Sequence, residues 1–369
     1  AGTEALFQGW AQGRCGIKSL TRFSATRYQT ALAGEVSRQD VLPHPVWLAG
    51  LLETVLQEAL AQARTRGVRP HDLRTAPVVV GTTKAWLGPL EAQVRSGGQN
   101  SGPASSWESL LADLLLRFDL QGPVRVVSLA CASGALALAQ AAESLATGRH
   151  PAVVAVGVDE LSDFVLTGFS SLKSLDPGPC RPFDAQRRGL SLGEGAAAVV
   201  LTQAKEVAQP LGYLSGWGFA NDATHLTAPN REGIGLTSAC VRALSSAACL
   251  PGSVHYINAH GTGTVYNDAM EAKAVAKVFG LPGPPVSTLK GNTGHTLGAG
   301  SVLEAVATWE ALRRRLAPPT CGLETPGVDE RLDFIVGAPR PLPAQARALS
   351  MSAGFGGFNA ALVLEAGEA

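Results

Sequence analysis

The chain has 369 residues, of which 46% are hydrophobic and only 16% are charged. This composition allows a large buried core and is not typical of disorder. The 30 Lys and Arg balance the 30 Asp and Glu, so the formal net charge of +0 gives no general attraction to nucleic acid or to an anionic membrane.

The six cysteines and the hydropathy pattern bear on compartment and on metal binding. The cysteines are scattered, with no C-x-x-C pair, which argues against a disulfide framework and against a zinc site. No early segment has the pattern of a secretion signal, and no apolar run approaches the roughly 18 residues that cross a bilayer. We therefore expect a cytoplasmic protein without a metal site.

Apolar spacing and β-branched runs predict the elements of the first half. Helices are expected over 4–10, 43–66 and 107–118 and after Cys131, and strands over 76–80, 124–129, 152–158, 195–201 and 211–219. The stretches 97–106 and 170–189 are predicted loops. The run Ala152–Val158 is apolar without polar alternation, as in a strand buried on both faces of a parallel or mixed sheet.

The second half repeats this pattern. Helices are expected over 235–248, 268–279 and 299–315, and strands over 254–259, near 286, and over 332–336, 348–352 and 359–364. In each half a short strand leads through a loop into an Ala-rich helix. We expect a duplicated α/β unit with halves 1–208 and 209–369 and its chemistry where they meet.

Cys131 lies at a predicted corner between a strand and a helix. The apolar stretch Val124–Leu129 precedes it, small residues flank it, and good helix formers follow from Ala135. A thiol at a helix N-terminus is near unpaired N–H groups, which favour the thiolate and can stabilise an oxyanion. Taken alone, the segment also fits a cysteine that only fills space in the core.

Two loops of the second half carry histidine. His260 lies just past a predicted strand in a run of glycines and threonines that suits an extended polar ligand. Lys290 and His295 share an eleven-residue stretch with four glycines, and Glu304 follows on the next helix. Buried lysine is rare without an acidic partner, so we expect a Lys290–Glu304 pair. The simpler interpretations are a structural histidine and a capped loop.

A third glycine-rich stretch, Ser352–Asn359, precedes the last predicted strand. It is compatible with a plain connection between two strands. The bulky Phe355 among glycines instead suggests a movable gate that exposes its backbone N–H.

Together these motifs resemble the elongating β-ketoacyl-acyl carrier protein synthases, which are condensing enzymes of the thiolase superfamily. The matching segments, in chain order, are 130–134, 181–184, 193–195, 258–264, Lys290 with 294–295, and 354–357. Asp268, eight residues after His260, and Glu304, after His295, also fit. The similarity runs over nearly the whole chain, and several motifs in register are far more specific than one.

The resemblance implies an α/β fold with five layers, αβαβα, made of two duplicated halves, and an acyltransferase that works as a dimer. Cys131 would receive an acyl group as a thioester, with the N–H groups of Cys131 and Phe355 as its oxyanion hole. His260 and His295 would assist decarboxylation of malonyl-carrier protein and stabilise the enolate, which attacks the thioester. Lys290 and Glu304 would complete the catalytic set.

Supporting roles follow from the same resemblance. Thr262 and Thr264 would bind the phosphopantetheine arm, which the acyl carrier protein delivers, so no other cofactor is implied. Asp268 and Phe358 would support the site. In this fold a cysteine at the position of His295 implies non-decarboxylating thiolases and an asparagine implies chain-initiating synthases, so His295 indicates elongation.

Three departures from the family pattern concern substrate and assembly. The family normally opens with a strand and a glycine-rich turn before the residues that match 1–10. Phe358 replaces the usual threonine, and 81–120 is shorter than in fatty-acid synthases of this type. That last region shapes the acyl pocket and the dimer contact, so type II polyketide or aryl polyene synthesis stands beside fatty acid synthesis.

Alternatives and partners complete the sequence-based hypothesis. The chain could instead be a non-catalytic, chain-length-determining partner subunit, or a cysteine acyl hydrolase. Expected partners are the acyl carrier protein and, in the dimer, an identical subunit or a chain-length-factor-like subunit, but neither nucleic acid nor membrane. Arg187, Arg188 and the run 313–315 are candidate contacts for an acidic carrier protein, although most such runs are simply solvated.

Overall fold

Two sheets, one from each half of the chain, frame the molecule. The computed structural model describes residues 2–25, 27–44, 46–85, 87–97, 107–207 and 209–367, so most of the predicted 97–106 loop lies outside the described residues. The first sheet has the order β4 (Val124–Val127), β3 (Val78–Gly81), β5 (Ala152–Asp159), β7 (Gly195–Thr202). The second has the order β10 (Val286–Ser287), β9 (Tyr256–Asn258), β13 (Arg347–Gly354), β14 (Phe358–Ala366), β8 (Gly212–Asn221).

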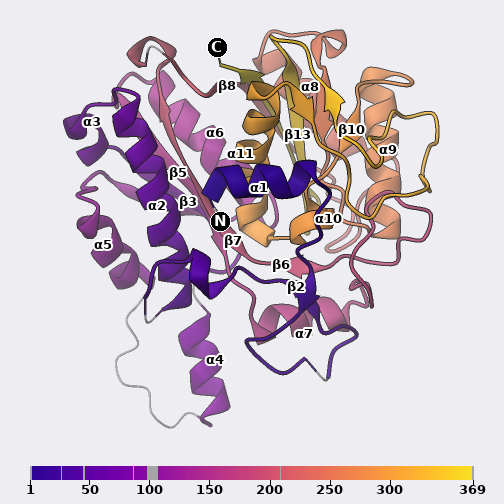
Figure 1. Ribbon diagram of the computed structural model, residues 1–369, viewed down its shortest axis with the longest axis horizontal. Helices are drawn as coiled ribbons and strands as arrows, with labels where there is room; N and C mark the ends of the chain where they lie inside the picture. Colours follow the sequence, from indigo (N-terminus) through magenta and orange to yellow (C-terminus); the bar gives the residue numbers. More distant parts are fainter. Residues whose placement is uncertain are drawn as a thin grey trace.

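Helices form three further layers around and between these sheets (Figure 1). One outer layer covers the first sheet with α2 (Trp47–Thr65) and α5 (Trp107–Arg117), and the other covers the second sheet with α8 (Ile234–Ser246) and α9 (Val265–Phe279). The central layer is α6 (Ser133–Ala146) and α11 (Gly300–Arg313), which contact each other and both sheets. The predicted αβαβα architecture is therefore confirmed.

Shorter elements connect these layers. The remaining helices are α1 (Gly2–Ala11), α3 (Pro70–Arg74), α4 (Gly88–Arg95), α7 (Asp163–Ser171) and α10 (Lys290–Thr293). Two small sheets consist of β1 (Lys18–Ser19), β2 (Leu32–Gly34) and β6 (Leu192–Gly193), and of β11 (Leu316–Ala317) and β12 (Arg340–Pro341).

The pairing of the strands confirms the predicted duplication. In each half a two- or four-residue edge strand, β4 or β10, pairs in parallel with β3 or β9, which pairs in parallel with β5 or β13. The next strand, β7 or β14, is antiparallel. Because α11 of the second half packs on β7 of the first, the division at 208/209 into domains stays a prediction.

Two local predictions were wrong. The predicted strand at 332–336 does not form: Phe334 makes only an isolated bridge to Val286, because β10 is only two residues long. Helix α7 was not predicted and extends to the start of the expected 170–189 loop. The Ser162 side chain accepts a hydrogen bond from the Val165 N–H and so caps α7.

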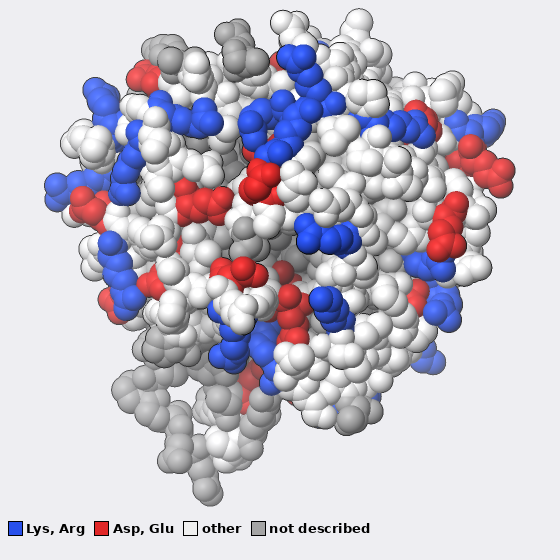
Figure 2. Space-filling view, viewed as in Figure 1, with Lys and Arg blue, Asp and Glu red and all other residues white. Residues whose placement is uncertain are grey.

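Charge and membrane criteria give plain results for the described residues. On the face seen in Figure 2, basic and acidic side chains are interspersed, as expected for the balanced composition. No described helix is both long and apolar enough to span a bilayer. The described part of the chain also holds no cluster of three or more potential metal ligands.

Close packing between the first sheet and the central layer depends on Gly157 of β5. A Cβ added there would lie 2.8 Å from Cγ2 of Val302 and 3.2 Å from Cα of Ala299. The backbone of β5 therefore approaches α11 more closely than any side chain would allow.

We expect Gly157→Ala to lower the free energy of unfolding by about 1–3 kcal/mol, because the added methyl group overpacks this contact. Urea unfolding followed by circular dichroism measures the change. The control is Gly168→Ala on α7, where nothing lies within 4 Å of the added Cβ. A loss at Gly157 no larger than at Gly168 would contradict the packing argument.

Candidate active site

Cys131 occupies a strained turn between β4 and α6. Ala130, directly before it, has a φ of +47°, a conformation that residues with a side chain rarely adopt. The Ser133 hydroxyl holds the turn, because it accepts from the Leu129 N–H at 2.8 Å and donates to the Ala130 carbonyl at 2.5 Å. The predicted strand, turn and helix around Cys131 are confirmed.

Burial controls the protonation of the Cys131 thiol. The residue is only 8% exposed, and burial raises the pKa of the thiol to about 11. The Lys290 charge and the backbone N–H groups of Phe355 and Cys131 lower this pKa without offsetting burial. The expectation that the helix N-terminus favours the thiolate was therefore wrong for the unliganded site, because loss of water outweighs the attraction.

His260 and His295 meet at the junction of the two halves. Their rings lie edge to face with centroids 5.1 Å apart. Burial, and then the nearby Lys290 charge, lowers both imidazole pKa values well below the ordinary value, so both rings are neutral. The Leu297 N–H donates to Nδ1 of His295 at 3.3 Å, which places the His295 proton on Nε2.

The predicted Lys290–Glu304 ion pair forms at the centre of the site. The ammonium contacts Oε1 of Glu304, and both side chains are almost fully buried. Burial raises the pKa of Glu304 while Lys290 lowers it. Lys290 also acts electrostatically on Cys131, His260 and His295. The structure thus brings the predicted thiol, imidazoles and ion pair into one environment.

The glycine-rich stretch of the second half reaches the Cys131 turn. Gly354, at the end of β13, lies so close that a Cβ there would be 3.1 Å from the Cys131 nitrogen. The Phe355 N–H faces the Cys131 sulfur. The Phe355 ring is half-buried and stacks on Phe169 of α7, with centroids 5.4 Å apart and ring planes at 24°.

The residues predicted to support the site lie around it. Asp268 of α9 accepts from the N–H groups of Phe183 and Gly263, at 2.7 and 3.2 Å, and so ties the His260 loop to the 181–184 stretch. The Thr262 and Thr264 hydroxyls are 3.0 Å apart in that loop. Phe358 begins β14 beside the gate glycines.

Two buried carboxylates were missed by the sequence analysis. Glu271 of α9 accepts from the N–H groups of His260 and Gly261, at 2.7 and 2.6 Å, and burial raises its pKa to about 8. Its position three residues after Asp268 on the same helix face was the available signal. Asp159, at the end of β5, accepts from the Gly298 N–H at 2.7 Å and the Thr83 N–H at 3.0 Å.

The predicted carrier-protein cations have acidic or carbonyl partners. Arg313 and Arg314 pair with Glu310, and Arg314 also contacts Glu4. The Arg187 side chain is mostly buried and donates to the Gly327 carbonyl at 2.9 Å. The remaining candidate, Arg188, has an exposed side chain paired with Asp176 at 3.2 Å.

Comparison with known proteins decides the family. Residues 49–207 match the model of the β-ketoacyl synthase N-terminal domain, and residues 211–324 match that of the C-terminal domain. The chain belongs to the β-ketoacyl synthase family. It is accordingly an acyltransferase of the ketosynthase type, as the sequence analysis predicted.

Individual ketosynthase relatives match over most of the chain. A 3-oxoacyl-[acyl-carrier-protein] synthase 2 from Coxiella burnetii is 32% identical over 97% of this chain and 93% of that protein. Nodulation protein E from Rhizobium meliloti is 36% identical over 84% of this chain and 79% of that protein. A solved ketosynthase from Xenorhabdus doucetiae, in complex with its chain length factor, is 29% identical, with a TM-score of 0.81 over 99% of this chain and 93% of that one.

Removing one member of the buried ion pair should be costly. We expect Glu304→Ala to lower the free energy of unfolding by about 3–5 kcal/mol, because it leaves the Lys290 ammonium buried without its partner. Lys290→Met combined with Glu304→Leu should restore most of this loss. Chemical denaturation measures all three proteins.

The exposed pair Lys273–Glu232 provides the control for this cycle. Glu232→Ala should cost much less than Glu304→Ala, because solvent screens surface charges. Equal losses from the two single variants would contradict a desolvated pair at Lys290.

The raised thiol pKa predicts a pH dependence of alkylation. The thiolate is the reacting form and is about one part in ten thousand at pH 7 for a pKa of about 11. Alkylation of Cys131 by iodoacetamide should therefore accelerate about tenfold per pH unit from about pH 7 to pH 9. Peptide mass spectrometry reports the rate for each cysteine.

Cys15 is the internal control. The Cys321 thiol donates a hydrogen bond to it and lowers its pKa to about 6, so its alkylation should be nearly constant above about pH 7. A Cys131 rate that also levels off near neutral pH would refute the buried, neutral thiol.

Proposed function

We propose that the chain catalyses decarboxylative Claisen condensation between an acyl group on Cys131 and malonyl-acyl carrier protein. The observation that carries this proposal is the shared environment of a buried thiol, two neutral imidazoles and one fixed ammonium. A cysteine hydrolase needs only one histidine as its base, and a second imidazole donor beside the same lysine favours carbanion chemistry.

The first half-reaction transfers the acyl group to Cys131. A soft sulfur nucleophile suits thioester exchange because it is also a good leaving group. Since the resting thiol is neutral, its proton must leave as the substrate arrives. The N–H groups of Cys131 and Phe355, which face the sulfur, would then stabilise the tetrahedral oxyanion.

The second half-reaction generates the carbanion. His295, with its proton on Nε2, and His260 would donate to the thioester oxygen of the malonyl group as CO2 leaves, because negative charge develops on that oxygen. The resulting enolate attacks the acyl carbon on Cys131 and releases the sulfur. Lys290 and Glu304 would keep both imidazoles neutral and in place.

Delivery of substrate follows from the same chemistry. The relative from Coxiella burnetii is named for its acyl carrier protein substrate, and Thr262 and Thr264 offer hydroxyl groups to a phosphopantetheine arm. No further cofactor is needed. Arg188, whose side chain is 66% exposed, is the candidate contact for the acidic carrier protein.

A dimer would form along the exposed edge of β4. Val124 and Val126 on that edge are 45% and 43% exposed although both are apolar. The partner is an identical subunit or a chain-length-factor-like subunit, since the Xenorhabdus doucetiae ketosynthase was solved with such a factor. The intact thiol and imidazoles favour the catalytic role over the chain-length-determining one.

The cell compartment and the pathway rest on weaker support. The cysteines of the described residues are all free thiols, which suits the reducing cytoplasm. Fatty acid synthesis and type II polyketide or aryl polyene synthesis use the same condensation.

Two variants should separate the half-reactions. Cys131→Ala should lower condensation by a factor on the order of 10⁴ or more, because no acyl-enzyme forms, while some decarboxylation of malonyl-carrier protein remains. His295→Ala should abolish decarboxylation but still form the acyl-enzyme, which intact-mass analysis detects. Condensation unchanged by Cys131→Ala, or an absence of CO2 release in the unmodified enzyme, would refute the mechanism.

A further inference from the structure

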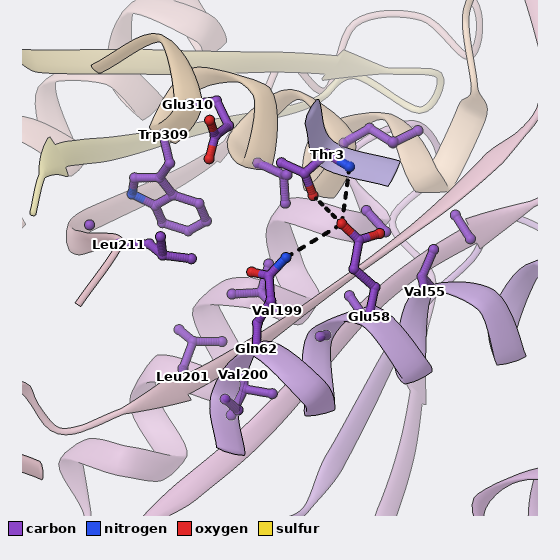
Figure 3. A pocket seen from close by; sticks show the side chains of 18 of the residues that line it. Thr3, Val55, Glu58, Gln62, Val199, Val200, Leu201, Leu211, Trp309 and Glu310 are labelled. Carbon is purple, nitrogen blue, oxygen red and sulfur yellow. Dashed lines mark hydrogen bonds between the residues drawn. The ribbon is translucent and has the colours of Figure 1, made fainter. Parts of the chain in front are cut away.

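A deep apolar groove runs along the free edge of β7, in the first half of the chain. Its cavity volume is about 670 Å³, and its walls come from α1, α2, α11 and the start of β8. Figure 3 shows Val199, Val200 and Leu201 of β7 opposite Val55 of α2, with Trp309 of α11 across the groove. Nothing in the condensation mechanism uses this groove.

The sequence of β7 is that of an interior strand. Gly195–Thr202 is a continuous apolar run of eight residues with no Lys or Pro, the residues that usually protect an exposed edge. Its side chains pack on both faces: Ala198 and Val200 on the cluster under α2, and Val199 and Leu201 on the cluster around the central helices. Even so, most of the strand is only half-buried.

The second half shows what such a strand is built to accept. Its counterpart β14 pairs with β13 on one edge and, antiparallel, with β8 on the other, and most of β14 is fully buried. The first sheet has strands equivalent to β10, β9, β13 and β14, but the described residues supply no equivalent of β8.

The backbone of β7 faces the groove with unpaired groups. The Val154 N–H donates to the Pro77 carbonyl on the β3 side, so Val153 and Ala155 turn their peptide groups toward β7, where they pair with Leu201 and Val199. The residues between and beside these in β7 therefore direct their N–H and C=O groups into the groove. These are Ala196, Ala198, Val200 and Thr202, and the described residues provide no partner for them.

We propose that this groove binds one extended polypeptide segment, which adds to β7 as an antiparallel strand and completes the first sheet. The groove follows eight residues of β7, roughly 26 Å of strand. Both walls are apolar, so the bound segment carries apolar side chains on both faces. Glu58 and Glu310 line the groove, so a basic residue at one end complements it.

An alkyl chain would fit the walls but not the edge. It would leave four residues of β7 with their peptide groups buried and unpaired, and each unpaired group costs about 1–3 kcal/mol. The edge of a second intact subunit cannot reach β7 between the helical walls. A single strand satisfies both the walls and the backbone, as in other cases of strand addition.

The test uses the whole chain and the acetylated, amidated peptide Lys-Val-Ala-Val-Val-Ala-Val-Lys. We expect saturable 1:1 binding by calorimetry and at least about tenfold slower hydrogen exchange at the N–H groups of Ala198 and Val200. The same peptide with its four central amides N-methylated should bind at least about tenfold more weakly. No binding at concentrations on the order of 1 mM would overturn the proposal.

Two matched variants on α2 locate the site. Ala59→Trp fills the groove and should weaken peptide binding at least about tenfold, whereas Ala61→Trp, on the exposed side of the same helix, should leave it unchanged. Equal binding of the methylated peptide, or displacement of the peptide by palmitate without protection of β7, would show an alkyl site and overturn the proposal. The exchange measurement needs no variant, so a folding defect in Ala59→Trp leaves the test intact.

Discussion

The buried charge of Lys290 is the interaction on which the rest of the site depends. A single ammonium with one carboxylate partner, in a region without water, holds its positive charge close to a thiol and two imidazoles. Because it disfavours a second cation nearby, both histidines stay neutral and can donate protons in hydrogen bonds. Because burial is stronger still at the sulfur, the thiol stays protected until a substrate arrives.

Much of this arrangement was predictable from sequence. Short motifs at strand ends identified Cys131, His260 and His295, and the rarity of unpaired buried lysine predicted Glu304 as a partner. The same reasoning failed on protonation, because a helix N-terminus is visible in sequence whereas the depth of burial is not. It also missed Glu271 and Asp159, whose role is to accept backbone N–H groups from distant loops and thus depends on tertiary packing.

The duplication explains why the chemistry lies where the halves join. Each half has a short edge strand followed by a turn and a central helix, and each turn contains a residue with positive φ, Ala130 in one and Leu297 in the other. The first turn presents the sulfur and the second fixes the His295 ring through the Leu297 N–H. Ancestrally similar corners have thus acquired different tasks. The first sheet differs from the second at its outer edge alone.

The contact of Gly157 with Val302 has a mechanical consequence. A strand of one half touches a helix of the other without any intervening side chain, so neither half can swing away from the other without breaking the core. A hinge-opening route for a long substrate is thereby closed. Access to the sulfur must come from small rearrangements of individual rings and loops, and the stacked pair Phe169 and Phe355 is the element best placed to yield.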